Sequence, residues 1–266
     1  MSLHRFFLED QVIAAETAEV FPLRLAPDDA RHARVLRLAP GEHVAVVDAA
    51  SDYFECEVVA VDGGLPEVRV ARRLDAPDEG PAVLLVQGLA KGDKMDDVIR
   101  HATELGVAGF VPLRCARSVV RLDERKAASR VERWRAIAKS AAMQSGQHRV
   151  PEVSAPLTVA QACEALAGAT AVLVCWEEAP SAARLGEALR GALAATETRV
   201  PADARVAVVV GPEGGLAPDE VDALLACNPR ASLVSLGPSI LRTETAGVVA
   251  PALVLYELGG LGGTGA

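Results

Sequence analysis

A glycine-rich turn at residues 211–215, with the sequence Gly-Pro-Glu-Gly-Gly, constrains the fold of this chain more than any other segment. It follows residues 205–210, a short valine-rich run that is typical of a buried strand in a parallel sheet. After the turn, Pro218 suits the first position of a helix, and Asp219 and Glu220 suit its first turn. The glycines therefore link the carboxyl end of a strand to a helix, which is where open α/β sheets bind ligands.

A second turn of the same kind lies near the end of the chain. Residues 232–236 are predicted to form a short strand, after which Gly237 and Pro238 turn the chain. Thr243 is predicted to be the N-cap of the last helix. Arg242 lies at this strand-to-helix junction, so its guanidinium is expected to point into the same crevice as Glu213.

Two common nucleotide-binding motifs do not fit the first turn. No Gly-Lys-Ser/Thr follows the glycines, which excludes a P-loop. The turn also lacks the GxGxxG pattern of dinucleotide-binding folds and comes late in the chain. Taken alone, either turn is equally compatible with an ordinary connection that binds nothing.

Taken together and in this order, the two turns resemble those of the SPOUT methyltransferases. The resemblance is greatest to the bacterial ribosomal RNA small subunit methyltransferase E family, which methylates N3 of a uridine in 16S ribosomal RNA. Further segments that resemble family motifs are residues 91–94, 103–106, 117–118 and 144–151. One departure precedes Gln144, where Ala142 and Met143 stand in place of the family's usual acid.

The resemblance implies an α/β protein of two domains. Residues 1–74 are predicted to form a PUA-like RNA-binding β-barrel, and residues 78–258 a SPOUT domain with a deep trefoil knot and a mostly parallel sheet. Residues 259–266 are predicted to be a flexible tail. The segment 75–81, rich in Pro, Gly and acids, marks the boundary.

Hydrophobic patterns predict the elements of both domains. In the first domain, strands are expected at residues 42–48, 53–61 and 66–71, and a short helix at residues 28–38. In the second, strands are expected at residues 82–88, 109–113 and 171–176, and helices at residues 95–105, 124–143, 158–166 and 181–193. A strand–helix–strand order predicts a parallel pair of strands at the start of this domain.

The resemblance also implies a cofactor, S-adenosylmethionine, held where three strand ends meet in one crevice. An adenine ring needs an apolar slot with a few backbone N–H and C=O groups, which loops of this composition supply. The residues predicted to bind the cofactor are Trp176, Gly211, Pro212, Glu213, Gly214, Gly215, Leu236, Gly237, Ile240 and Leu241.

Methylation of uridine N3 requires loss of the imide proton, because the neutral nitrogen has no free lone pair. A general base near the ring, or groups that stabilise the anion on O2 and O4, would meet that need. Arg242 is predicted to stabilise the anion, and Glu213 or Glu244 to act as the base. For both glutamates, a salt bridge with Arg242 or a role in the helix turn is an equal alternative. No metal ion is predicted.

The charge of the chain is unevenly distributed. The net charge is −9, yet residues 88–150 hold 13 basic and 7 acidic side chains. A solvated helix face is the ordinary explanation of such a segment. With the family resemblance, it predicts an RNA-binding patch instead, with Lys91, Lys94 and Arg114 as contacts. The resemblance of residues 32–41 to the family's PUA-like domain adds Arg5, Arg34 and Arg37 as predicted phosphate contacts, with ordinary surface arginines as the alternative.

The cysteines and the apolar segments limit which metal sites, disulfides and membrane segments can be predicted. The five cysteines are far apart in sequence and form no CxxC pair, which predicts neither a metal site nor a disulfide framework. No apolar run is long enough for a membrane span, and the N-terminus does not resemble a signal peptide. A cytoplasmic homodimer that does not bind membranes is predicted, with the last helix in its interface.

The substrate expected from the resemblance is 16S ribosomal RNA within the assembled or nearly assembled small subunit. Three other functions stay open: ribose 2′-O-methylation by another SPOUT enzyme, RNA binding without catalysis, and a small-molecule α/β enzyme. The last would have no use for the basic segment.

Overall fold

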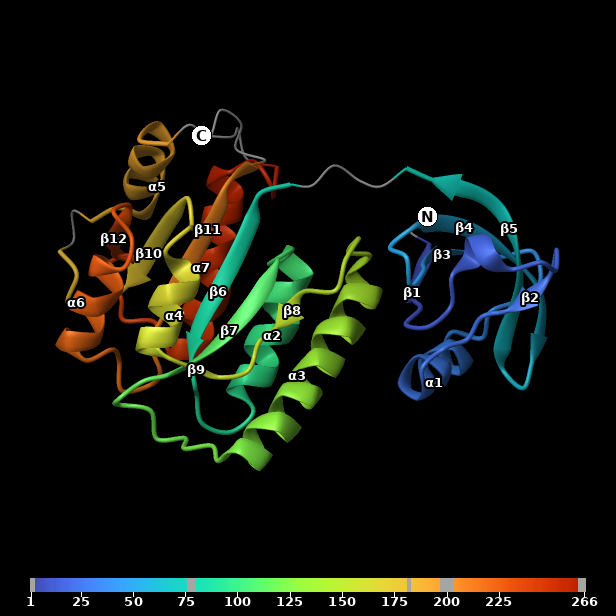
Figure 1. Cartoon of the computed structure of the whole chain (residues 1–266), viewed down its shortest axis with the longest axis horizontal. Coiled ribbons are helices and arrows are strands. Elements are labelled where there is room, and N and C mark those ends of the chain that lie inside the picture. Colours follow the sequence, from blue (N-terminus) through green and yellow to red (C-terminus); the bar gives the residue numbers. More distant parts are fainter. Residues whose placement is uncertain (1–2, 76–79, 181–182, 197–202, 263–266) are drawn as a thin grey trace. The chain divides into compact units, whose positions relative to one another are not determined.

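The computed structural model describes residues 3–75, 80–180, 183–196 and 203–262 (Figure 1). Contacts between Cα atoms divide the chain into two compact units. The first holds residues 1–78 and 142–149, and the second holds residues 79–141 and 150–266. Most of the predicted boundary segment, the first two residues of the helix predicted at 181–193, and the last four residues of the predicted tail lie outside the described residues.

The first unit is built on a five-stranded sheet. Strand β1 is parallel to β3, and the other neighbours are antiparallel. The strand order is β1 (His4–Phe7), β3 (His43–Val47), β4 (Tyr53–Asp62), β5 (Leu65–Leu74) and β2 (Phe21–Pro22). Within the described residues no pairing joins β1 to β2, so the sheet is not closed into a barrel.

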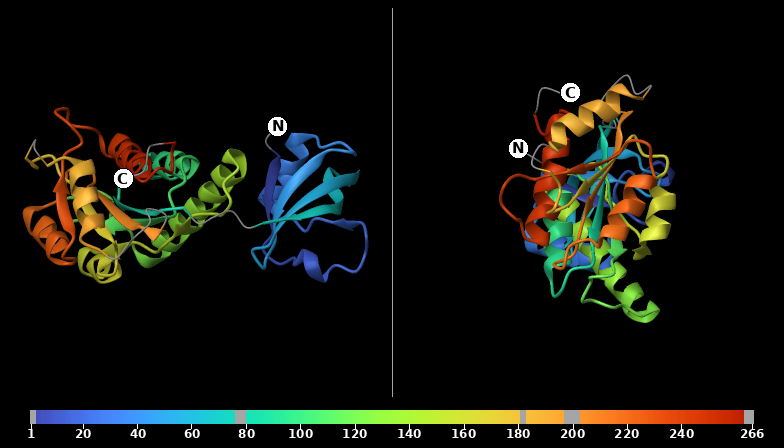
Figure 2. Two further views of the ribbon diagram at one scale, coloured as in Figure 1. Left: turned by 90° about the horizontal axis from the view of Figure 1, so that it is seen from above. Right: turned by 90° about the vertical axis from the view of Figure 1, so that its left-hand side faces the viewer.

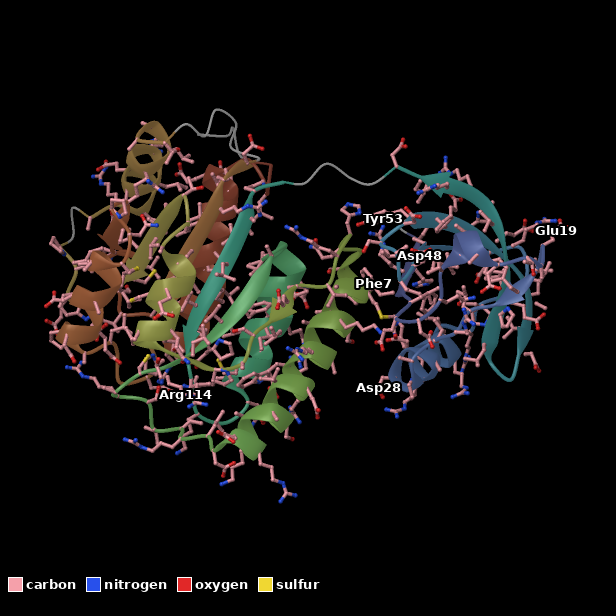
Figure 3. All side chains as sticks on the ribbon, viewed as in Figure 1. Phe7, Glu19, Asp28, Asp48, Tyr53 and Arg114 are labelled. Carbon is pink, nitrogen blue, oxygen red and sulfur yellow. The ribbon has the colours of Figure 1, made fainter. Side chains whose placement is uncertain are left out.

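The three longer strands of this unit were predicted from their alternation. Strands β1 and β2 and the 3₁₀ helix at Ile13–Ala15 were missed, because such short segments show no period. Helix α1 (Pro27–Leu36) ends at Arg37, which adopts the left-handed conformation with φ 53°. The predicted loop between β3 and β4 is held by Asp48, labelled in Figure 3. Its carboxylate accepts backbone N–H groups of Ile13, Ala50 and Asp52.

The second unit holds a seven-stranded sheet whose pairings are all parallel. The order is β12 (Ala231–Val234), β10 (Ala171–Cys175), β11 (Arg205–Val210), β6 (Ala82–Gly88), β7 (Gly109–Arg114) and β8 (Glu152–Val153), with β9 (Leu157–Thr158) beside β7. The predicted parallel pairing of the first two strands of this domain, β6 and β7, is confirmed. The mostly parallel α/β fold is thereby confirmed as well.

Helices cover both faces of this sheet. Along β6, Val83 and Leu85 pack into one buried cluster and Val86 into another, as the two-residue period of a strand requires. The first cluster takes side chains from α2 (Lys94–Leu105), α3 (Glu124–Ser145), α5 (Leu185–Ala194) and α7 (Thr243–Glu257), and the second from α4 (Val159–Leu166) and α6 (Pro218–Ala226). The right-hand view of Figure 2 shows α7 in red on one side and α4 and α6 on the other.

Local chemistry explains several helix ends. Thr158 caps α4 in a reciprocal capping box with Gln161, and Pro218 is the first residue of α6, both as predicted. The prediction for α7 was wrong by one residue. Arg242 is the N-cap, and Thr243 is the first helical residue, whose hydroxyl bonds the carbonyl oxygen of Gly211 instead of capping the helix. No described helix is long and apolar enough to cross a membrane.

Candidate active site

A pocket of about 590 Å³ lies where strands β10, β11 and β12 end. Its walls come from the segments that follow these strands and from the beginnings of α2 and α7. The residues predicted to bind the cofactor all line it except Gly214. The other lining residues include Lys94, Cys175, Glu177, Val210, Ser235, Pro238, Ser239, Arg242, Thr243 and Ala246.

Gly215, rather than Gly214, is the glycine that shapes the pocket wall. Gly215 has φ +71°, and a Cβ atom there would lie against the carboxylate of Glu177. Because Glu177 is exposed and can move, the cost of a side chain comes from the strained backbone. Gly214 faces away from the pocket, since a Cβ atom there would lie 2.9 Å from the carbonyl oxygen of Arg117.

Thr243 ties the two glycine-bearing turns together. Its hydroxyl donates to the carbonyl oxygen of Gly211 at 2.6 Å and accepts from Nε2 of Gln87 at 2.8 Å. Both side chains are buried, which strengthens such hydrogen bonds and makes their loss costly. Gln87 was not predicted as a site residue, although a lone polar side chain in an apolar strand could have indicated it.

Lys94 lies between two carboxylates at the edge of the pocket. Its ammonium is 3.1 Å from Oε1 of Glu213 and 3.0 Å from Oε2 of Glu244. Glu213 also accepts the backbone N–H of Lys91 at 3.0 Å. The salt bridge that competes with a catalytic role for both glutamates is therefore made by Lys94, whereas Arg242 was the expected partner.

These contacts set the protonation states of the three groups. Burial raises the pKa of Glu213, but backbone N–H groups and the Lys94 ammonium outweigh it and hold the pKa below its ordinary value. The pKa of Glu244 is lowered in the same way, with the same opposition from burial. Hydrogen bonds to Glu244 and Glu213 raise the pKa of Lys94. Both glutamates are thus ionised near neutral pH, and their lowered pKa values make them weak proton acceptors.

Arg242 and Trp176 offer free polar groups to a ligand. Arg242 is exposed, lines the pocket and makes no hydrogen bond or ion pair with the residues that the structure describes. The indole Nε1 of Trp176 is buried and has no hydrogen-bond partner among them. An unpaired buried donor is costly, so a ligand acceptor at this position would be favoured.

The residues predicted to contact RNA have different surroundings. Arg114 is exposed at the end of β7 (Figure 3). In the first unit, exposed Arg34 donates to the carbonyl oxygen of Gly63 at 3.1 Å, and Arg37 is exposed as well. Arg5 is half-buried, and its guanidinium donates to the carbonyl oxygen of Gln147 at 2.8 Å. Their contacts with RNA stay predictions.

The loop after β7 packs against the glycine-rich turn. The Arg117 guanidinium donates to the carbonyl oxygen of Gly214 at 3.4 Å, and Glu220 of α6 accepts the backbone N–H of Ala116 at 2.7 Å. Sequence reasoning did not place Arg117 at the site, although residues 117–118 had been noted as a family motif.

Comparison with known proteins places the chain in a family. A family model described as an RNA methyltransferase domain matches residues 78–255. The ribosomal RNA small subunit methyltransferase E of Mycobacterium bovis is 37% identical over 229 residues, which cover 84% of this chain and 82% of that protein. The protein of the same name from Bacillus subtilis is 32% identical over 259 residues, covering 96% and 97%. The chain belongs to the ribosomal RNA small subunit methyltransferase E family.

Solved structures of methyltransferases share its fold. The family member from Neisseria gonorrhoeae, bound to S-adenosyl methionine, has a TM-score of 0.74 and 26% identity, covering 95% of this chain and 97% of that one. A methyltransferase from Legionella pneumophila, in complex with the same cofactor, has a TM-score of 0.73 and 25% identity, covering 96% and 98%. The family resemblance drawn from the two turns is confirmed.

Proposed function

We propose that this protein transfers the methyl group of S-adenosylmethionine to N3 of a uridine in 16S ribosomal RNA. The observation that carries the proposal is the pocket at three parallel strand ends, in a chain of this methyltransferase family. An RNA methyltransferase of this family needs a cofactor site and a basic side chain free to meet the base. Arg242 at the rim of the pocket is such a side chain.

The residues present fit the cofactor. Leu236, Ile240 and Leu241 provide apolar surface for an adenine ring, and the adjoining glycines leave backbone groups accessible. Glu177 gives the pocket an acidic group that suits a cationic sulfonium, whereas Glu213 is paired with Lys94. When bound, the cofactor supplies a methyl group activated by that sulfonium. The protein has to orient the uridine and favour the loss of the proton from N3.

The chemistry of the site favours stabilisation of the uridine anion over proton removal by a glutamate. Glu213 and Glu244 are held ionised by Lys94 and backbone N–H groups, which lowers their basicity. Arg242 can donate to O2 or O4 of the ring, where the charge of the deprotonated imide collects. We therefore assign to Arg242 the stabilisation of the uridine anion. The two glutamates and Lys94 are assigned a structural role in the wall of the pocket.

Several finer features belong to the same proposal. We infer a trefoil knot around the pocket, supported by the return of the chain after β12 to bond Gly211 through Thr243. The first unit is inferred to be a PUA-like RNA-binding domain, supported by its small mixed sheet and exposed arginines. A homodimer acting in the cytoplasm on the assembled or nearly assembled small subunit completes the proposal.

The test is a methylation assay with a mapped product. Small ribosomal subunits and free 16S ribosomal RNA, each from cells lacking the modification, are incubated with the protein and the cofactor, and nucleosides are separated by mass spectrometry. The expected product is 3-methyluridine, with subunits preferred over free RNA. Arg242→Ala should lower kcat roughly 100-fold and leave the cofactor Kd unchanged. A 2′-O-methylated nucleoside, or no methylation of either RNA, would overturn the proposal.

A further inference from the structure

Two cysteines on neighbouring helices lie side by side in the second unit. Cys163 belongs to α4, and Cys227 follows the last residue of α6. The Cys163 thiol donates to the carbonyl oxygen of Ala223 at 3.5 Å, and the Cys227 thiol lies 3.0 Å from that of Leu224. Both acceptors are in the last turns of α6, so both sulfurs sit at the same end of this helix.

The two thiols are therefore neighbours across the packing of α4 on α6, and both are partly buried. Burial, followed by the charge and hydrogen bond of Cys163, raises the pKa of Cys227 to about 11. A disulfide requires two cysteines that the fold brings together, which these two helices do, whereas sequence spacing alone predicted no disulfide.

Other cysteines of the chain are in a different position. Cys56 and Cys115 are buried, and burial raises the pKa of each thiol to about 12. Thiols of this kind are inert, because burial in the core gives an oxidant no access to them. They serve as internal controls for the reactivity of the partly buried pair.

We propose that Cys163 and Cys227 are a redox modification site, which hydrogen peroxide converts into a disulfide that joins α4 to α6. The Cys163 thiolate attacks the peroxide, the O–O bond breaks, and a sulfenic acid and one water form. Cys227 then attacks the sulfenic sulfur, the S–O bond breaks and a second water leaves. Both sulfurs are oxidised, the peroxide is reduced, and the thiol protons end in water.

The position of the pair gives the disulfide a structural consequence. Helix α6 begins just after the glycine-rich turn of the pocket, and Glu220 in its first turn holds the backbone N–H groups of Ala116 and Ala217. A disulfide at the other end would fix α6 to α4 as well. The cross-link closes a long loop, so it should raise the melting temperature, by roughly 5 °C.

The experiment treats the full-length protein with hydrogen peroxide, blocks remaining thiols by alkylation, and maps peptides without reduction. The expected result is a linked peptide pair containing Cys163 and Cys227, which disappears on treatment with dithiothreitol. Cys56 and Cys115 should stay reduced in the same sample. The melting temperature of the oxidised protein should rise and return to its original value after reduction.

Two variants make the assignment specific. Cys163→Ser and Cys227→Ser should each abolish the linked peptide and the rise in melting temperature, and should melt close to the reduced wild type. The proposal is overturned if peroxide leaves both thiols free for alkylation, or if it oxidises each of them separately without linking them. Neither result bears on the methyltransferase assay, because neither thiol lines the pocket.

Discussion

At the scale of residues, the pocket depends on one lysine held between two glutamates. The lowered pKa values of Glu213 and Glu244 keep both carboxylates charged, and the raised pKa of Lys94 keeps the ammonium charged. The stability that the glutamates gain is present above their ordinary pKa of 4.5 and is lost as the pH falls through the lowered values. The gain of Lys94 is present below 10.5 and is lost as the pH rises through its raised pKa.

This linkage predicts the pH dependence of catalysis. Since none of the three groups changes charge between about pH 6 and pH 9, their titration cannot shape the rate there. We expect kcat/KM to rise with pH in this range, because the uridine imide ionises more readily at higher pH. The slope should be the same in Glu213→Gln and Glu244→Gln, even where the absolute rate falls.

The measurement is a pH–rate profile of methyl transfer for the wild type and both variants. Loss of the pH-dependent limb in either variant would identify that glutamate as the general base and contradict the assignment to Arg242.

A second prediction at this scale concerns Gly215. In Gly215→Ala, the new Cβ atom would sit on a backbone with φ of +71°, which L-residues rarely adopt. We expect the affinity for S-adenosylmethionine to fall at least roughly 10-fold, as measured by calorimetry. Gly168→Ala is the matched control, because a Cβ atom there meets nothing within 4 Å. Equal affinities in the two variants would show that the turn does not shape the cofactor site.

At the scale of elements, Asp96 fastens α3 to α2. Its side chain, buried at 2% exposure, accepts Nε of Arg133 at 2.8 Å and the indole Nε1 of Trp134 at 3.1 Å. The first turn of α2 also carries Lys94, so this contact helps to fix the beginning of the helix that borders the pocket.

Removal of this carboxylate should destabilise the second unit. In Asp96→Ala, the buried indole N–H loses its acceptor and the partly exposed Arg133 loses the nearer of its two carboxylates, at a cost of about 1–3 kcal/mol. Asp97→Ala is the control, because Asp97 is exposed and its ion pair is with Arg100 on the same helix, a contact that contributes about 0.5 kcal/mol or less. The free energies of unfolding of the two variants and the wild type are measured by urea unfolding monitored by circular dichroism. A small, equal loss in both would mean that Asp96 does not hold α3.

At the scale of the whole molecule, α7 offers a surface for a second copy of the chain. Leu253 is 41% exposed and Tyr256 is 54% exposed, whereas Leu255 packs in the core. In addition, α7 supplies Thr243 and Ala246 to the pocket, so an interface on this helix would lie beside the site.

We therefore predict a homodimer that the double variant Leu253→Glu, Tyr256→Glu separates. Burying two carboxylates without partners in an apolar interface is strongly unfavourable. Light scattering at micromolar concentration should give the mass of a dimer for the wild type and of a monomer for the variant. Val35→Glu, at a position of the first unit that is 74% exposed, is the control and should stay dimeric. A monomeric wild type would contradict the prediction.

An acidic protein must hold ribosomal RNA through a local basic surface, and this predicts the salt dependence of binding. Neutralising Arg114 or Arg34 to Gln should weaken RNA binding and reduce the slope of log K against log salt by roughly one unit for each lost phosphate contact. Cofactor affinity should not change, since neither side chain lines the pocket. Arg190→Gln is the control, because this arginine pairs with Glu257. Unchanged slopes in both test variants would mean that RNA binds elsewhere.

The sequence by itself determined what depends on neighbouring residues. Apolar runs predicted β6 and β11, Thr158 predicted the start of α4, and Pro218 predicted the start of α6. The two glycine-bearing turns located the pocket, because strand ends followed by glycine leave the backbone open to a ligand. These features arise from local periodicity, capping and backbone freedom, so they can be predicted without knowledge of the fold.

Only the tertiary structure decided which side chains meet. Lys94 was predicted to bind RNA, and its pairing with Glu213 and Glu244 appears only when α2, the first turn and α7 converge. Gly214 and Gly215 are adjacent and chemically identical, yet one packs on Arg117 and the other borders the pocket. Cys163 likewise reaches the end of α6 that carries Cys227 only through the packing of α4 on α6. Such contacts join residues distant in sequence, and their energies depend on burial and distance, which no local pattern records.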